Sequence, residues 1–261
     1  MSIIVVLEWK FSPPNYFEAP IKIARDDYTL TIADGKAEAR IDSAIYDANP
    51  TMRQSLHDAM NDRLLGVQLL SHRSYELARS TMTRVHPDGR KDVFLEVEPA
   101  RIVMTAHPVD FHVRDRNGNI VVDSKRDRIE KKRSLADLVS IYRASDGTLA
   151  SLLRSYDAAV RDPNNELVHL YEIREALSVK FGGEEALRST LSISSSQWSR
   201  IGELCNNAPL RQGRHRGKTS GVLRDATESE LTEARGIART MTEAYLRYLD
   251  TSMRKVVDDD R

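Results

Sequence analysis

Apolar and polar residues alternate in two short segments near the start of the chain. The alternating apolar positions are Tyr28, Leu30 and Ile32 in the first segment and Ala37, Ala39 and Ile41 in the second. Successive side chains of a β-strand point to opposite faces, so this pattern predicts two half-buried strands. Asp34-Gly35 lies between them and favours the positive φ angles of a tight turn. The segment is therefore predicted to form a β-hairpin.

Further strands are expected on both sides of this hairpin. Residues 3–11 are apolar and aromatic, and the run ends at Ser12-Pro13-Pro14, because proline lacks the backbone donor that a sheet needs. Two more hairpins are expected around turn sequences, with strands at residues 75–85 and 93–97 flanking Pro87-Asp88-Gly89, and at Val113 and residues 120–122 flanking Asn117-Gly118. The first half is thus predicted to be rich in β-structure.

One long helix interrupts this β-rich half. From Thr51 onward the apolar residues recur every three or four positions, and one face carries Met52, Leu56, Ala59, Met60, Leu64 and Val67. That period predicts an amphipathic helix. Thr51 and Gln54 have the spacing of a capping box at its start.

The helical period returns after residue 134 and continues almost to the end of the chain. Apolar stripes predict helices at residues 135–142, 149–160, 166–181, 184–191, 194–205 and 227–249. Their ends are indicated by a Gly182-Gly183 cap and by capping boxes at Ser194 with Gln197 and at Thr227 with Glu230. Short connections between such helices favour an antiparallel bundle.

These elements predict an α+β protein with two domains. Residues 1–127 are expected to form a β-rich N-terminal domain with one long helix, and residues 128–261 an all-α antiparallel helical bundle. The apolar run at the start is short and has no basic residues before it, so we expect no signal or membrane segment, no membrane partner and a cytoplasmic protein.

Charge and cysteine content restrict the partners and the chemistry. Lys plus Arg and Asp plus Glu both number 39, so the net charge is zero and any attraction to nucleic acid must be local. Cys205 stands alone, which excludes an internal disulfide and a cysteine-rich zinc site, and its helical spacing with Trp198 and Ile201 favours core packing.

Two basic segments are candidates for a local attraction. Residues 124–133 contain six basic and two acidic side chains, and we interpret them as a solvated helix start or linker, with a nucleic-acid contact as the alternative. Residues 211–218 combine a histidine, three arginines and a lysine with two glycines, between two predicted helices.

Several chemistries do not fit the second basic segment or its surroundings. Gly213 and Gly217 are separated by three residues where a phosphate-binding loop has four, and no predicted strand precedes them. A metal site at His107, Asp110 and His112 has no second ligand cluster. No Gly-x-Ser-x-Gly nucleophile elbow is present. We expect no metal and no cofactor.

Of the chemistries considered for residues 211–218, phosphodiester cleavage is the one that remains. A histidine with a pKa near neutrality can take or give a proton, and an arginine can clamp a phosphate and stabilise the charge that develops on it. Arg211 and His215 are four residues apart, so on a helical turn both would project from one face. RNA suits such a pair, because its 2′-hydroxyl can act as an internal nucleophile.

A helical bundle with an Arg-and-His motif between its penultimate helix and a long amphipathic last helix resembles the HEPN superfamily of bacterial toxin and antiviral ribonucleases. The resemblance covers residues 130–250 and places Arg211 and His215 at the motif. It implies metal-independent RNA cleavage in a cleft shared by two protomers. Further RNA contacts would come from Arg214, Arg216 and Lys218.

The motif departs from the family pattern, in which four to six residues separate the arginine from the histidine; here three do, and Gln212 stands where asparagine often follows the arginine. We expect a HEPN-like RNA-binding protein or metal-independent ribonuclease in stress response or phage defence, with RNA as partner and a homodimer formed through the helical domain. The alternative is a non-enzymatic interaction or dimerisation protein whose basic loop binds an acidic partner.

Overall fold

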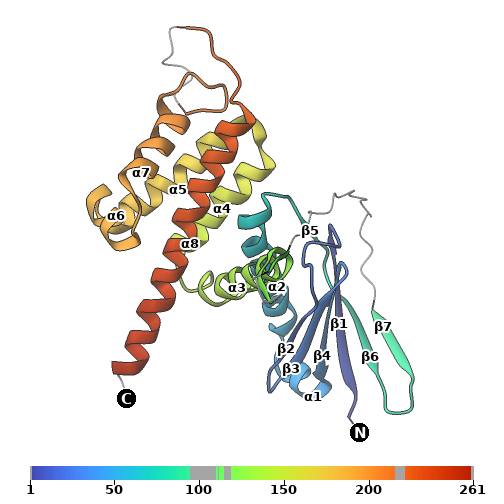
Figure 1. Cartoon of the computed structure of the whole chain (residues 1–261). Helices are drawn as coiled ribbons and strands as arrows, with labels where there is room; N and C mark the ends of the chain where they lie inside the picture. Colours follow the sequence, from blue (N-terminus) through green and yellow to red (C-terminus); the bar gives the residue numbers. More distant parts are fainter. Residues whose placement is uncertain (1, 95–109, 111, 115–118, 215–220, 260–261) are drawn as a thin grey trace. The chain divides into compact units, whose positions relative to one another are not determined.

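The computed structural model describes most of the 261-residue chain, namely residues 2–94, 110, 112–114, 119–214 and 221–259. The chain forms two compact units, a sheet unit of Met1–Val67 with Tyr75–Asp137 and a helical unit of Gln68–Ser74 with Leu138–Arg261. An antiparallel sheet in the N-terminal half is followed by helices, so the predicted α+β class is confirmed (Figure 1).

The sheet unit is built on an antiparallel sheet in which β1 is central. Its strands are β1 (Ile4–Ser12), β2 (Ile21–Ala24), β3 (Tyr28–Ala33), β4 (Lys36–Asp42), β5 (Glu76–Leu77), β6 (Thr81–Val85) and β7 (Lys91–Phe94). They follow the order β2-β3-β4-β1-β6-β7, and β5 pairs with the end of β1. The predicted β3–β4 hairpin is confirmed, with Asp34 at φ 49° and Gly35 at φ 77° in its turn.

One face of this sheet is the core of the unit. Val5, Leu7 and Trp9 of β1 point to the same face and are fully buried. After a short helix, α1 (Ser43–Ala48), the helix α2 (Met52–Ser71) lies along that face (Figure 1). The predicted long helix is therefore confirmed, and its apolar stripe supplies the other half of the core.

The start of α2 differs from the prediction. The Thr51 hydroxyl donates to Asn49 Oδ1 at 3.0 Å, and the Gln54 amide donates to Asp58 Oδ1 at 2.9 Å. The predicted capping box at Thr51 is wrong, because both side chains satisfy their hydrogen bonds with other neighbours.

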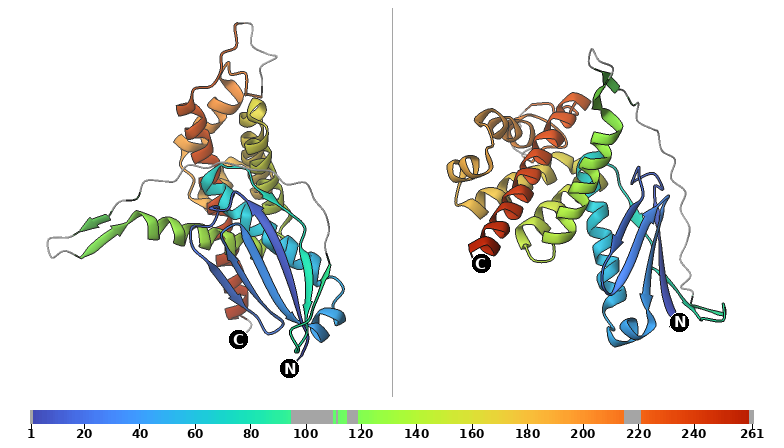
Figure 2. Two further views of the ribbon diagram at one scale, coloured as in Figure 1. Left: turned by 90° about the vertical axis from the view of Figure 1, so that its right-hand side faces the viewer. Right: turned by 60° about the horizontal axis from the view of Figure 1, so that its bottom comes forward.

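The second and third predicted hairpins are present with different limits. β6 pairs with β7 around a turn with Gly89 at φ 85°, but residues 75–85 hold two separate strands, and residues 95–97 lie outside the described residues. β8 (His112–Arg114) pairs with β9 (Ile120–Asp123), and their turn lies outside the described residues. Figure 2 shows this pair leading into α3 (Ser124–Tyr142).

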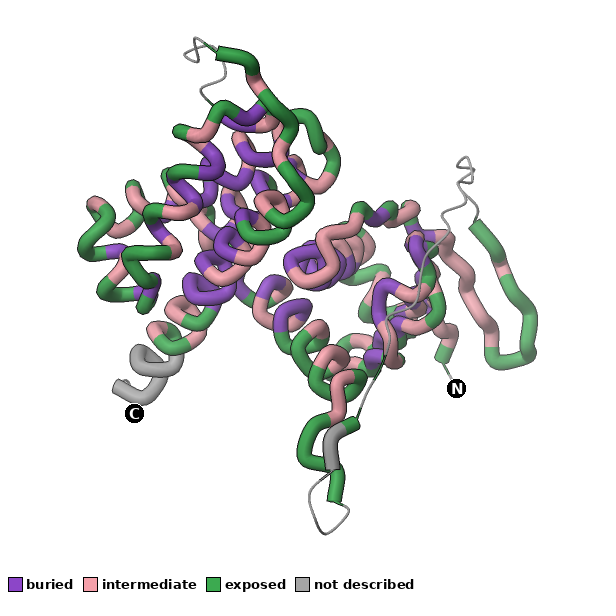
Figure 3. Tube along the Cα trace, turned by 45° about the horizontal axis from the view of Figure 1, so that its top comes forward, coloured by how far each residue is buried: buried purple, intermediate pink, exposed green. Residues whose placement is uncertain are grey.

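The helical unit contains the remaining helices. They are α4 (Gly147–Arg161), α5 (Glu166–Phe181), α6 (Glu184–Leu191), α7 (Ser195–Gly202) and α8 (Glu228–Asp259). A 3-10 turn, Pro163–Asn165, joins α4 to α5, and a π-helical turn, Glu203–Asn207, follows α7. Buried positions follow the facing sides of these helices (Figure 3), and α4, α5 and α8 pack on one another.

Three predicted helix caps are confirmed, whereas α8 continues to Asp259, beyond the predicted end at residue 249. Gly182 ends α5 in the left-handed region at φ 74°. Ser194 and Gln197 form the capping box that opens α7. Thr227 and Glu230 form the box at the start of α8, where each backbone N–H donates to the other side chain, at 2.8 and 3.2 Å.

Candidate functional site

The basic segment, residues 211–218, lies between the π-helical turn and α8. The candidate phosphate clamp Arg211 and the candidate RNA contact Arg214 are described. The other three candidates lie outside the described residues: His215, Arg216 and Lys218. The pairing of Arg211 with His215 therefore stays a prediction.

Backbone hydrogen bonds hold the beginning of the basic segment. The Arg211 N–H donates to the Arg224 carbonyl at 3.0 Å, and the Arg224 N–H donates to the Pro209 carbonyl at 3.1 Å. The Arg214 N–H donates to the Cys205 carbonyl at 2.9 Å. The segment is thus tied to the π-helical turn on one side and to residue 224 on the other.

The Gln212 side chain ties the same segment to the start of α8. Its Oε1 accepts a hydrogen bond from the Ala226 N–H at 3.0 Å, and its Nε2 donates to Asp225 Oδ1 at 3.4 Å. Gln212 therefore has a structural role in this chain.

The three described arginines of the loop and its base, Arg211, Arg214 and Arg224, each have an acidic partner. Arg211 lies 3.6 Å from Asp225, and both side chains are more than 60% exposed. Arg214 bonds to Glu175 of α5, and Arg224 bonds to both oxygens of Glu230 at 2.8 and 2.6 Å. Exposed pairs of this kind contribute about 0–1 kcal/mol each. An incoming phosphate would therefore displace Asp225 or Glu175, whose pairs are exposed, at modest cost.

Glu230 is the most strongly held of these acids. Hydrogen bonds from Arg224 and from the Thr227 N–H outweigh its partial burial and lower its pKa to about 2. The negative charge also lies in the first turn of α8, where the helix dipole favours it. Glu230 therefore stays ionised through the physiological range and holds Arg224 at the base of the loop.

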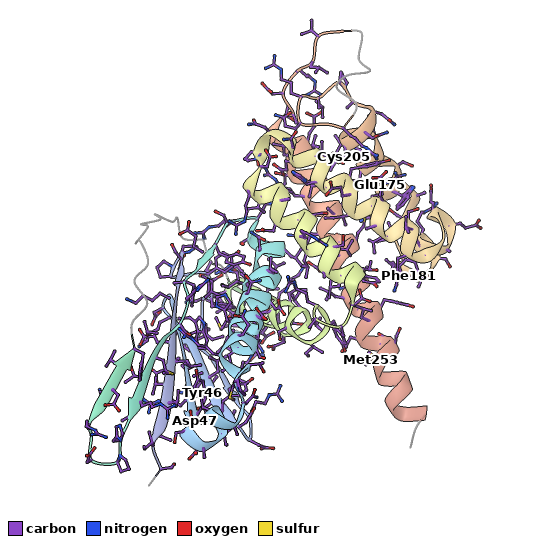
Figure 4. The ribbon with its side chains drawn as sticks, turned by 180° about the vertical axis from the view of Figure 1, so that it is seen from behind. Tyr46, Asp47, Glu175, Phe181, Cys205 and Met253 are labelled. Carbon is purple, nitrogen blue, oxygen red and sulfur yellow. The ribbon has the colours of Figure 1, made fainter. Side chains whose placement is uncertain are left out.

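An aromatic and cationic cluster lies beneath Arg214. The Arg174 guanidinium of α5 lies 3.9 Å from the centre of the Trp198 ring of α7, and its Nη1 donates to the Tyr171 hydroxyl at 2.8 Å. Arg174 and Arg214 lie 5.2 and 5.1 Å from the centre of the Tyr171 ring. Figure 4 labels Glu175 and Cys205 at the same end of the helical unit.

Sequence reasoning missed the three α5 residues of this cluster, Tyr171, Arg174 and Glu175. The helical spacing places Tyr171 and Arg174 on the packing face of the helix predicted at residues 166–181, and no pattern indicates Glu175. Arg214 is 39 residues away from Glu175, so no local pattern links them. An arginine on the packing face is the one signal that could have indicated them.

The other titratable groups nearby have structural roles. Burial raises the pKa of the Cys205 thiol to about 12, so it is no nucleophile at neutral pH. Glu166, 2% exposed, accepts two hydrogen bonds from Arg235 at 2.6 and 2.9 Å and lies 3.4 Å from His72 Nε2. Burial opposes ionisation of Glu166, but the bonds from Arg235 and His72 lower its pKa.

The other basic segment, residues 124–133, is helical from Ser124 onward, as one of its two structural interpretations expected. Arg128 and Lys132 both bond to Glu18, at 2.5–2.8 Å. Arg126 contacts the neighbouring acid Asp127 at 3.3 Å. Much of its positive charge is thus neutralised inside the sheet unit, which makes it a weaker candidate than residues 211–218.

Two shallow hollows lie elsewhere on the helical unit. One, of about 470 Å³, lies between α7 and α8, and its charged lining residues already pair with one another: Arg200, Glu203 and Glu233. The other, of about 380 Å³, is lined by α8 and the end of α6. Neither concentrates unpaired charge at a reactive group.

Comparison of the chain with known protein families, curated proteins and solved structures gives no match. Within residues 2–94, 112–114, 119–214 and 221–259, no helix combines the length and the apolar content needed to cross a bilayer. The assignment of function therefore depends on the chemistry of the basic segment.

Proposed function

We propose that the helical unit binds RNA through residues 211–218 and cleaves it without a metal ion, as a HEPN-like ribonuclease. The supporting observation is the hydrogen-bonded base of the basic segment. Bonds to Cys205 and Arg224 fix the backbone at Arg214 and Arg211, so two arginines stand at fixed points on an exposed surface. Fixed cations lose less conformational freedom when they clamp a phosphate than flexible ones do.

The proposed reaction is an internal transfer at phosphorus. The 2′-oxygen of the ribose forms a bond to phosphorus, and the bond from phosphorus to the 5′-oxygen breaks. His215 takes the 2′-hydroxyl proton or gives a proton to the departing 5′-oxygen, and water carries the other of these two protons. Arg211 stabilises the added negative charge on the phosphoryl oxygens. The products are a 2′,3′-cyclic phosphate and a 5′-hydroxyl.

The proposal includes an assembly and a setting. Two copies would form the cleft through their helical units, so that each contributes an arginine and a histidine. The setting would be a cytoplasmic stress response or phage defence. Both parts come from the resemblance of residues 130–250 to HEPN ribonucleases.

A second candidate is an interaction module without catalysis. It is favoured by the acidic partners of Arg211 and Arg214, because Asp225 and Glu175 already occupy these cations within one chain. In that case the basic segment binds an acidic protein surface. The zero net charge of the chain agrees with this candidate, since constitutive RNA binders are more often basic.

Cleavage of total cellular RNA in chelator tests the first candidate. We expect the purified protein to leave 2′,3′-cyclic phosphate ends and the His215→Ala variant to lose at least 100-fold in rate, since general acid–base catalysis contributes about 10²–10⁴-fold. Arg154→Met is the matched control: Arg154 is an exposed arginine on α4, and its loss should leave the rate unchanged.

Two results would count against the ribonuclease. Cleavage that persists in His215→Ala removes this histidine from the mechanism. RNA binding without cleavage, in the presence and absence of chelator, supports a binding module instead.

A further inference from the structure

We propose that Arg174 and Arg214 form one phosphate-binding site against the Tyr171 ring, and that Glu175 occupies the Arg214 side of this site while no ligand is bound. The phosphate would belong to an RNA strand, and in that respect the inference rests on the proposed function. Arg174 and Glu175 lie on α5, outside the basic segment.

Arg174 is held in place without an acid. Its guanidinium lies against the Trp198 ring and next to Gly202, where an added Cβ would meet Arg174 Cζ at 3.6 Å. Its Nε is buried, and among the described residues this atom has no hydrogen-bond partner and the side chain forms no ion pair. Arg174 is thus a rigid cation without an acidic partner among the described residues, a combination that suits an anion.

Arg214 brings a second guanidinium to the same ring. The two cations share Tyr171, which is 8% exposed, at 5.2 and 5.1 Å from its centre. The direct acidic partner of Arg214 is Glu175, and Glu172 adds a second negative charge that acts on the same arginine without bonding to it. The neighbouring Glu172 hydrogen-bonds to Ser155 at 2.8 Å. A phosphate that takes the place of Glu175 would bond to Arg214 beside the ring that Arg174 also contacts.

The bond between Glu175 and Arg214 shows how Glu175 would compete with a phosphate ligand. Its carboxylate bonds to Arg214 in the way that a phosphate oxygen would, and both side chains are more than 40% exposed. A pair this exposed is weak, so a phosphodiester can displace Glu175 without unfolding α5. Arg211, three residues from Arg214 and in an exposed pair with Asp225 at 3.6 Å, can then take a neighbouring phosphate of the strand.

The test measures binding of a fluorescein-labelled 12-nucleotide single-stranded RNA to full-length protein in the His215→Ala background, where the probe stays intact. Arg174→Met should weaken binding about tenfold, as expected for loss of a charge-assisted hydrogen bond. It should also lower the slope of log K against log salt by about 0.7, the value for one phosphate contact on a single strand. Arg174→Lys, which keeps the charge, should keep the slope.

Glu175→Gln removes the competing carboxylate and should tighten binding about two- to fivefold. This gain cannot arise from misfolding, which protects the test against a damaged Arg174 variant. The matched control Arg154→Met removes an exposed arginine from α4 and should leave the affinity and the salt slope nearly unchanged.

The outcomes separate this site from the proposed activity. Equal affinities and slopes for Arg174→Met and Arg154→Met, or no gain in Glu175→Gln, would overturn the phosphate site even if wild type cleaves RNA. The expected binding changes together with absent cleavage would support the site and reject the ribonuclease. Equally tight binding of a poly-glutamate peptide, with the same response to the variants, would overturn the assignment of phosphate as ligand.

Discussion

Gly66 of α2 lies directly against the backbone of α3. A Cβ built on Gly66 would lie 2.7 Å from the Leu135 carbonyl oxygen and 2.8 Å from the Ala136 Cα. Both are backbone atoms and cannot rotate away. We expect Gly66→Ala to lower the free energy of unfolding by about 1–3 kcal/mol, as overpacked sites do. Urea denaturation measures this change.

Gly236 of α8 provides the control for that prediction. A Cβ at Gly236 meets nothing within 4 Å, and the residue lies inside a helix. Gly236→Ala should therefore stabilise the protein by up to about 1 kcal/mol, because alanine loses less conformational entropy. If Gly66→Ala were also neutral or stabilising, the close approach of the two helices would be wrong.

Cys205 should react only after the helical unit opens. The residue is fully buried, and burial raises its thiol pKa to about 12. At pH 8 we expect iodoacetamide to label less than a tenth of the native protein in an hour and all of it in 6 M guanidinium, as read by mass spectrometry, because the thiolate is the reacting form. Rapid labelling in buffer would contradict the buried position.

The candidate site was only partly predictable at this scale. The sequence indicates residues 211–218, because arginines, a histidine and glycines crowd one loop. It does not indicate Glu175 or Arg174, because their contacts with Arg214 and Trp198 join segments that are distant in the chain. Which acid neutralises which arginine is decided by tertiary packing.

At the scale of elements, hydrophobic period and turn chemistry predicted most of what the structure contains. The β3–β4 hairpin combines strict alternation with an Asp-Gly turn, and the helices from α4 to α8 combine apolar stripes with recognisable caps. Local sequence signals were sufficient to predict these elements because local preference and tertiary packing favour the same structure there.

The start of α3 is an element boundary that local sequence patterns alone do not fix. The apolar stripe begins only at residue 135, so the sequence leaves a helix start and a linker both open for residues 124–133, whereas α3 begins at Ser124. Asp123 Oδ1 accepts the Arg126 N–H at 3.0 Å, and distant Glu18 bonds to the side chains of the first turns. The π-helical turn after α7 likewise has no local sequence signal.

At the scale of the whole molecule, the two units have contributions from segments that are not contiguous. Gln68–Ser74 belongs to the helical unit although the chain on both sides of it belongs to the sheet unit. The sequence alone does not show that Gln68–Ser74 belongs to the helical unit, because this depends on contacts with residues distant in the chain. One of them is Tyr156, whose hydroxyl donates to the Leu69 carbonyl at 3.2 Å. The predicted boundary between residues 127 and 128 stays a prediction.

The balance of charges over the whole chain makes the stability of the folded protein depend on pH. The chain carries 39 basic and 39 acidic side chains, so acid leaves a large net positive charge. Glu18 is among the most strongly held acids: its burial opposes ionisation, but hydrogen bonds from Arg128 and Lys132 outweigh it and lower its pKa from 4.5 to about 2. The stabilisation by Glu18 is therefore complete above pH 4.5 and is lost as the pH falls toward 2.

We expect this carboxylate to account for about 2 kcal/mol of the stability lost between pH 7 and pH 3, since one pKa unit corresponds to about 1.4 kcal/mol and the titration is incomplete at pH 3. Glu18→Gln should be less stable than wild type at pH 7 and should lose correspondingly less on acidification, as measured by urea denaturation at both pH values. Glu130→Gln, on the exposed side of α3, should lose as much unfolding free energy between pH 7 and pH 3 as wild type does. An equal loss of unfolding free energy between pH 7 and pH 3 in all three proteins would show that Arg128 and Lys132 do not hold Glu18 in solution.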